Sequence, residues 1–302
     1  DSDFAKYMGA GVIGGKNKKL DEQDFERMKV KGTCQVLEKN YLRLTAPPRA
    51  ELVRPLAVLE RHLQNLKGEY KLPPSKRHDY AWFCSQLKAI RQDLTVQQIF
   101  TAFTVDVYEC HARIALEEGD LNEFNQCQTQ LKELYGNLQD DPKAIANENE
   151  FVAYRLVYYV LLTGNKKYEE GSTDLFKIML TLTASRRSDP TIAHALKVRE
   201  SVAEFNFHSF FRLYRSCPTK HGELLMKFLL PNVRQWALNR ICKAYRPSVE
   251  VNFVLEQLGF EMIGDGRKFL ESCGCLFLNE DELNTKDTVV RESDLKEQNS
   301  LI

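Results

Sequence analysis

Cysteine and histidine are the side chains in this sequence best suited to nucleophilic catalysis or metal binding, and the chain has eight cysteines and six histidines. Only Cys273 and Cys275 lie close together, and one such pair without a second is a weak zinc signal. No histidine has a second histidine or a cysteine at metal-ligand spacing on a shared helix face. No local signature marks a cysteine nucleophile with its base. We therefore predict no catalytic and no metal-binding residues, and a protein that is not an enzyme.

A glycine motif near the start of the sequence has the spacing of a dinucleotide-binding loop. Gly9, Gly11 and Gly14 match G-x-G-x-x-G, which works only between a strand and a helix whose N-terminus faces the pyrophosphate. Here only eight mostly polar residues precede the motif, and the polar run KNKKLDEQ follows it. We therefore predict no cofactor and interpret residues 1–20 as a flexible tail rich in glycine and lysine.

The charge distribution contains one local excess. Lys and Arg total 42 and Asp and Glu total 42, so the net charge of zero argues against a polybasic nucleic-acid binder. Between Glu223 and Glu250, however, no acidic residue occurs. A basic surface there would suit phosphate contacts, whereas an ordinary helix would find its acidic partners elsewhere in the fold. The candidate nucleic-acid-binding residues are Arg234, Arg240, Lys243, Arg246, Arg267 and Lys268.

The elements that would position these residues are mostly helices. Apolar residues make up 43% of the chain, and no run reaches the roughly 18 apolar residues of a membrane span. The scattered cysteines predict a reduced intracellular protein. Apolar residues recur with the helical period in eight segments before residue 217. The expected helices cover about 55–68, 80–93, 96–118, 121–135, 147–163, 173–185, 190–204 and 207–216.

Two segments of similar pattern predict tight corners between antiparallel helices. Residues 115–127 and 201–213 each end one helix and begin another, and Gly119 followed by Asp120 has the residue types of a C-cap and an N-cap. Such helix pairs are typical of a TPR-like helical solenoid, although no strict 34-residue period is present. The nearby aromatic residues are interpreted as packing inside this solenoid. They are Phe205, Phe207, Phe210 and Phe211.

The pattern changes near Pro231. Three short helices are expected over 233–247, 249–260 and 266–274, followed by two short strands at 275–278 and 287–290 with an acidic turn between them. Three helices followed by a two-stranded wing is the order of a winged-helix domain. The predicted organisation is a tail over 1–20, an extension and helical-repeat region over 21–222, a winged helix over 223–292 and a polar tail over 293–302.

Three stretches are more specific than generic helices. They are GTCQVLEKNYLRLTAPP with VRPLAVL (32–59), LKAIRQDLTVQQI (87–99) and YECHARIALEEGDLNEFNQCQTQLKELY (108–135). Together they resemble the Sac-three/GANP family of PCI-type scaffolds, and within it the branch of leukocyte receptor cluster member eight and Thp-three. The match runs from about Val30 to Val290. Lys88 and Arg91, in the second stretch, are interpreted as solvated or paired with nearby acids such as Asp93.

The resemblance implies a fold, partners and a role. It implies PCI architecture, in which a helical repeat leads into a winged helix, and a nuclear, non-enzymatic protein that pairs with a second PCI protein and a small acidic Sem/DSS peptide. It also implies action in transcription-coupled mRNA processing, surveillance or export, with RNA or another nucleic acid as a partner. Because the winged helices of PCI pairs are expected to meet, the candidate interface residues are Leu276, Phe277, Val289 and Val290.

Two other functions stay open from the sequence. One is a PCI subunit of the proteasome-lid or signalosome type, which binds protein only. Salt-dependent RNA binding separates it from an RNA-binding scaffold, because phosphate contacts weaken steeply with salt. The other is an enzyme such as a cysteine-dependent hydrolase, which would require a pocket that contains a cysteine with a histidine in hydrogen-bonding reach.

Overall fold

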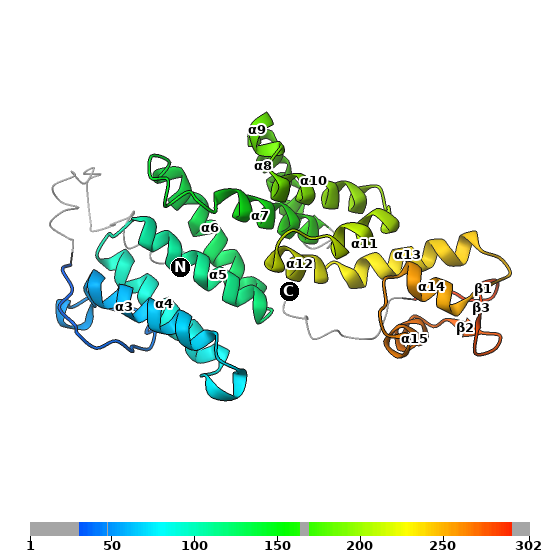
Figure 1. The fold of residues 1–302 in the computed structure, drawn as a ribbon, viewed down its shortest axis with the longest axis horizontal. Helices are drawn as coiled ribbons and strands as arrows, with labels where there is room; N and C mark the ends of the chain where they lie inside the picture. Colours follow the sequence, from blue (N-terminus) through cyan, green and yellow to red (C-terminus); the bar gives the residue numbers. More distant parts are fainter. Residues whose placement is uncertain (1–29, 47, 164–168, 292–302) are drawn as a thin grey trace, which may run out of the picture.

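The computed structural model describes residues 30–46, 48–163 and 169–291. The predicted tails at 1–20 and 293–302, together with the glycine motif, lie outside these residues. The predicted predominance of helix is confirmed. The elements follow one another along the long axis of the molecule, from α3 and α4 at one end to the small sheet at the other (Figure 1).

From residue 50 to the end of α12 the described chain is mostly helical. Its elements are η1 (Ala50–Leu52), α3 (Leu56–Tyr70), η2 (Pro74–Lys76), α4 (Tyr80–Val96), α5 (Ala102–Glu117), α6 (Leu121–Asn137), α7 (Glu148–Thr163), α8 (Glu169–Thr181), α9 (Ala184–Arg187), α10 (Pro190–Ala203), α11 (Phe207–Arg215) and α12 (Lys220–Lys227). Most agree with the expected helices to within a few residues. The helix expected from residue 96 begins only at Ala102, because Gln98 has a φ of 56° and breaks the helical path between α4 and α5.

Both predicted corners are present, and they are built alike. Gly119 has a φ of 79°, and the Asp120 side chain accepts a hydrogen bond from the backbone N–H of Glu123. At the second corner Phe205 has a φ of 54°, and the Asn206 side chain caps α11. These short connections bring α5 against α6 and α10 against α11.

Three apolar clusters follow one another along the molecule. The first joins α3, α4 and α5, and it includes one face of α5, with Val107 and Ile114 buried. The second is the largest and extends from α5 to the beginning of α13. The third fills the C-terminal part. Because α5 contributes to the first two clusters and α13 to the last two, the helices form a continuous packed array.

The C-terminal part combines three helices with a three-stranded antiparallel sheet. Its elements are α13 (Leu230–Ala244), β1 (Ser248–Glu250), α14 (Val251–Gln257), α15 (Ile263–Ser272), β2 (Leu276–Phe277) and β3 (Glu282–Asn284). The strand order is β1-β3-β2, and Leu283 of β3 pairs with Val249 on one side and Phe277 on the other. No helix in the described part of the chain is long and apolar enough to cross a membrane.

The strand predicted over 287–290 is wrong. The strand that pairs with β2 is β3, which lies inside the segment expected to be an acidic turn. Leu283 is fully buried and anchors β3, whereas Val289 is 72% exposed. Thr288, two residues after the turn, accepts a hydrogen bond from the backbone of Leu276 through its hydroxyl, which closes the end of the sheet without a further strand.

Candidate nucleic-acid interface

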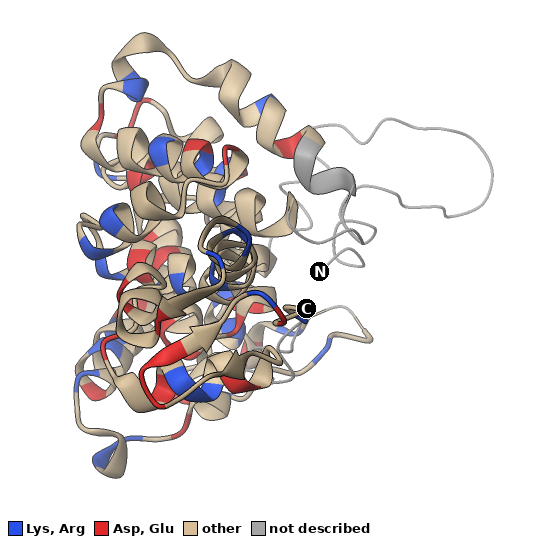
Figure 2. Cartoon of the chain, turned by 90° about the vertical axis from the view of Figure 1, so that its right-hand side faces the viewer, with Lys and Arg blue, Asp and Glu red and all other residues tan. Residues whose placement is uncertain are grey.

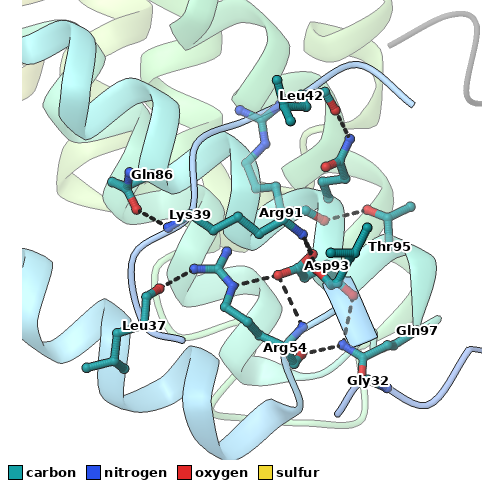
Figure 3. A network of polar contacts seen from close by, with 12 residues as sticks. Gly32, Leu37, Lys39, Leu42, Arg54, Gln86, Arg91, Asp93, Thr95 and Gln97 are labelled. Carbon is teal, nitrogen blue, oxygen red and sulfur yellow. Dashed lines mark hydrogen bonds and ion pairs between the residues drawn. The ribbon is translucent and has the colours of Figure 1, made fainter. Parts of the chain in front are cut away.

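The first family-like stretch forms an extended strap across α4, held by a buried ion pair (Figure 3). The Arg54 side chain has no exposed surface, and its Nε lies 2.6 Å from Oδ2 of Asp93 on α4. Lys39 Nζ lies 2.6 Å from the other oxygen of the same carboxylate. Arg54 Nη1 also donates to the carbonyl of Leu37 at 2.6 Å. One carboxylate therefore fixes the strap to α4 at two points, Lys39 and Arg54.

Gln97 closes the same network, which joins the residues of the first two family-like stretches. Its Nε2 donates to the carbonyl of Arg54 at 2.8 Å, and its Oε1 accepts from the backbone N–H of Gly32 at 3.0 Å. A Cβ at Gly32 would lie 2.4 Å from the carbonyl oxygen of Val53, so no other residue fits there without a backbone shift. These contacts give the first two stretches a structural role.

A second buried network joins α4 and α6. Both Lys88 and Arg91 are paired, but their partner is Glu123 and not the predicted Asp93: Lys88 Nζ lies 2.6 Å and Arg91 Nη1 2.5 Å from the Glu123 carboxylate. Asp93 lies on another face of α4 and is already used by Arg54. The Arg91 guanidinium also lies 3.1 Å from Nδ1 of His111 on α5.

This network brings together three side chains of the kinds that bind metal ions, which their spacing in the sequence did not reveal. Cys84, His111 and Glu123 have ligand atoms within 4.8 Å of one another, although they come from three helices. Burial, with the charges of Arg91 and Lys88, holds the pKa of His111 well below its usual value. Burial also raises the pKa of the Cys84 thiol. With its carboxylate already paired to two cations, the cluster is suited to joining helices and not to binding another cation.

A shallow hollow between α7, α10 and α12 is lined by a cysteine and a histidine, the pair that an enzyme would require. Each has its own backbone partner, however. His194 Nε2 lies 2.9 Å from the carbonyl oxygen of Leu213, and the Cys217 thiol donates to the carbonyl of Thr219 at 3.4 Å. Burial raises the pKa of Cys217, which disfavours its thiolate. This geometry does not activate a nucleophile.

The predicted nucleic-acid-binding residues fall into two groups in the structure. Arg234 is half-buried: its guanidinium donates to the carbonyls of Leu258 and Gly259 at 3.1 and 3.2 Å and stacks 3.8 Å from the Phe260 ring. The Arg267 guanidinium lies over the Phe277 ring at 5.1 Å. Both cations thus hold elements of the C-terminal part together.

The other four predicted residues are exposed. Arg240 and Lys243 lie on α13, Arg246 follows it, and Lys268 lies on α15. Arg246 Nη1 donates to the carbonyl of Lys286 at 3.2 Å, so its guanidinium reaches across toward the end of the sheet. Seen from this end of the molecule, basic and acidic segments are interspersed (Figure 2). Basic residues therefore form no extended face at this end of the described chain.

The predicted interface residues also differ in exposure. Leu276 is 49% and Val289 is 72% exposed, whereas Phe277 lies under Arg267 and Val290 packs against the C-terminal apolar cluster. Further aliphatic side chains are exposed in the same part of the chain, and sequence reasoning missed them. They are Met262, Ile263 and Leu278. Leu278 lies two residues after Leu276, so both fall on one face of an extended segment, and this spacing could have pointed to Leu278.

Known proteins resemble this chain over most of its length. The profile of the SAC3/GANP family matches residues 16–279. The Leukocyte receptor cluster member 8 homolog of Xenopus laevis is 41% identical over 261 residues, which are 86% of this chain and 30% of that protein. The THP3 homolog C2A9.11c of Schizosaccharomyces pombe is 40% identical over 250 residues, 83% of this chain and 59% of that protein. Protein THP3 of Saccharomyces cerevisiae is 33% identical over 270 residues, 89% of this chain and 54% of that protein.

These relatives confirm the branch predicted from the sequence. The chain spans less than two thirds of the length of each of these three proteins. The matched residues 16–279 include the segments that build the two buried networks of α4. With the profile matching most of its length, the chain belongs to the SAC3/GANP family.

Proposed function

We propose that this chain is a non-enzymatic nuclear scaffold of PCI architecture that binds RNA through a basic surface on its C-terminal winged helix. In this proposal it pairs with a second PCI protein and a small acidic Sem/DSS-type peptide, and it acts in mRNA processing, surveillance or export. Membership of the SAC3/GANP family supports the scaffold role. The observation that carries the RNA-binding role is the exposure of four cations on and beside α13 and α15.

The order of elements supports a winged helix. Helix α13 is followed by β1, α14, α15, β2 and β3, and the strands pair in the order β1-β3-β2. In helix-turn-helix relatives the recognition helix approaches the nucleic acid, and here the corresponding helix is α15, which carries Lys268. The proposed division at residues 21–222 and 223–292 falls within α12 (Lys220–Lys227), which packs on the helical side, while α13 contributes to both apolar clusters.

The exposed cations favour contacts with phosphates over sequence-specific contacts with bases. Lys243, Arg246 and Lys268 are exposed, and no ion pair links any of them to an acidic side chain in the described residues. Unpaired cations gain more from a phosphate than paired ones do, because no existing partner must be displaced. Arg234 and Arg267 are left out of the proposed surface because they are only partly exposed, and backbone carbonyls and an aromatic ring hold them in place.

The alternative is a subunit that binds protein only, and the sheet end supports it. Leu276, Leu278 and Val289 are exposed, which suits a protein partner. The turn between β2 and β3 carries Glu280 and Asp281, whose charges would repel phosphates. In the proposed scaffold this end faces the second PCI protein, and α13 and α15 face the RNA.

Charge reversal tests the proposal. The triple variant Lys243→Glu, Arg246→Glu and Lys268→Glu is expected to bind RNA far more weakly than the parent at low salt, with no change of sequence preference. The control Lys71→Glu, Lys76→Glu and Lys143→Glu changes the net charge by the same amount at exposed lysines elsewhere, and should bind like the parent. Both variants should fold and retain the second PCI protein. Equal RNA affinity of the parent and the first variant would favour the protein-only subunit.

A further inference from the structure

An aromatic cluster on the surface links the helical region to the C-terminal part. Phe205 and Phe207, which the sequence predicted to be core, flank Trp236 on α13: the ring centroids of Phe205 and Trp236 are 5.4 Å apart, and those of Phe207 and Trp236 are 6.1 Å apart. Phe210 and Phe211 are buried as predicted, but Phe205 is 48% exposed. In Figure 1 the corner between α10 and α11, which holds Phe205, lies beside α13.

Phe205 occupies a backbone position that disfavours its side chain. Its φ is 54°, and the equivalent position of the α5–α6 corner is Gly119. The two corners have the same hydrogen bond across the turn, from Asn206 N–H to the Ser201 carbonyl and from Asp120 N–H to the Ala115 carbonyl, both at 2.8 Å. Left-handed backbone is uncommon for a bulky residue. A large aromatic ring is thus kept, partly in solvent, where glycine would serve the fold.

A cation lies over this ring, although the exposed acidic residue Glu204 directly precedes Phe205 in the chain. The Arg240 guanidinium lies 4.9 Å from the centre of the Phe205 ring, and Lys243 is exposed one turn further along α13. Residues 205–249 contain eight lysines and arginines but a single acidic residue, Glu223. Glu223 lies on α12, away from the aromatic cluster in the chain. An exposed aromatic ring with a cation over it, in a basic segment, suits a ligand that has flat apolar rings and negative charges.

We propose that Phe205, Trp236 and Arg240 form a site on which bases of single-stranded RNA stack, while Lys243 contacts the backbone phosphates. This inference rests on the proposed function and deepens it, because it names the form of RNA that is bound. Bases stack on exposed aromatic and guanidinium groups only when they are unpaired, since in a duplex their faces are covered by neighbouring bases. The site should therefore prefer single strands over duplexes of equal charge.

The substitution Phe205→Gly tests the proposal because it should weaken RNA binding without lowering the stability of the fold. Glycine relieves the left-handed backbone, so the melting temperature should not fall. Loss of the ring should weaken binding of a single-stranded oligouridylate about tenfold. Binding of a duplex of the same length should stay within twofold. The matched control is Phe100→Gly, which removes a phenylalanine of 50% exposure between α4 and α5 and should leave both affinities unchanged.

A spectroscopic readout covers the case in which Phe205→Gly fails to fold. The chain has two tryptophans, Trp82 and Trp236. Trp82 is stacked on His78, with ring centroids 3.9 Å apart, at the other end of the helical region. In a Trp82→Phe variant the remaining tryptophan fluorescence comes from Trp236. Saturating oligouridylate should quench it strongly, whereas the duplex should quench it little.

The outcomes separate this inference from the proposed function. Three results together would contradict the stacking site: equal binding of single strands and duplexes by the parent, unchanged binding by Phe205→Gly, and no quenching of Trp236. The RNA-binding scaffold would still stand in that case. If the parent binds neither form of RNA, both are wrong. Weaker binding of the single strand by Phe205→Gly, together with quenching of Trp236, supports the stacking site.

Discussion

Buried charged side chains lie at junctions between helices in this protein, and those on α4 are paired with a partner from another element. Arg54 is paired with Asp93, and Arg91 and Lys88 are paired with Glu123. A buried pair of this kind adds little net stability compared with apolar residues, but the loss of one partner leaves an uncompensated charge. At the scale of single residues, these positions therefore specify which helices meet.

The pH dependence of folding should report the buried histidine of this network. The pKa of His111 in the folded protein is held well below its usual value by burial and by Arg91. The unfolded chain therefore binds a proton near pH 6.5 that the folded protein excludes, and stability present at neutral pH is lost as the pH falls below 6.5. We expect the stability advantage of the parent over His111→Gln to shrink by about 2 kcal/mol between pH 7 and pH 5. Urea unfolding at the two pH values measures it, and a constant difference would contradict the buried neutral histidine.

Gly119 and Gly68 make a matched pair of substitutions to alanine. Gly119 has a φ of 79° and open space where a Cβ would be, so Gly119→Ala costs stability only through the backbone, by about 1 kcal/mol or more. Gly68 lies within α3, also with open space, so Gly68→Ala should stabilise by up to about 1 kcal/mol. Thermal unfolding of both variants measures the expected loss of stability in Gly119→Ala and the expected gain in Gly68→Ala. A stabilising Gly119→Ala would mean that the corner is not left-handed in solution.

At the scale of elements, the strap over 30–54 depends on α4 for its position. Asp93 accepts from Arg54 and from Lys39, so Asp93→Asn leaves buried positive charge and should cost about 3–5 kcal/mol. Hydrogen exchange should then rise in residues 32–42. The double variant Arg54→Met and Asp93→Leu removes both charges of the buried pair and should be less destabilised than Asp93→Asn alone. Equal protection of the strap in Asp93→Asn and the parent would show that the network does not hold it.

Arg234 provides a test of how the C-terminal helices are joined. Its guanidinium binds the carbonyls at the end of α14, so Arg234→Met should reduce the free energy of unfolding by about 1–3 kcal/mol. Because that guanidinium is occupied, the salt dependence of RNA binding should be the same as in the parent. Chemical unfolding and fluorescence anisotropy measure the two quantities. A changed salt dependence of RNA binding with unchanged stability would show that Arg234 contacts RNA and does not join the helices.

The helices were predictable because their signals are local. The helical period and the cap residues Asp120 and Asp189 mark several helix ends within a few residues. The strands β1 and β3 were not predictable, because each has three residues and one buried side chain, which is too short for an alternation to be recognised. Features that depend on contacts between distant segments were also missed, such as the pairing of Glu123 and the exposure of Phe205.

At the scale of the whole molecule, the chain is an extended array in which each apolar cluster shares a helix with the next. Trp236 on α13 packs against both the central and the C-terminal cluster, so the helical region and the C-terminal part meet at the same helix that carries Arg240 and Lys243. The proposed RNA surface thus lies at the junction of the two parts, and the exposed apolar end of the sheet is left for a protein partner.

The salt dependence of RNA binding tests the central claim most directly. The slope of log K against log salt concentration reports the number of phosphate contacts, at roughly 0.7 per contact for a single strand. We predict a clearly negative slope for the parent with an oligouridylate. The triple variant Lys243→Glu, Arg246→Glu and Lys268→Glu should have a slope shallower by about 2, the value for three lost contacts. The control with Lys71, Lys76 and Lys143 changed to glutamate should keep the slope of the parent. Equal slopes for the parent and the first triple variant, or RNA binding by the parent that does not respond to salt, would contradict the account.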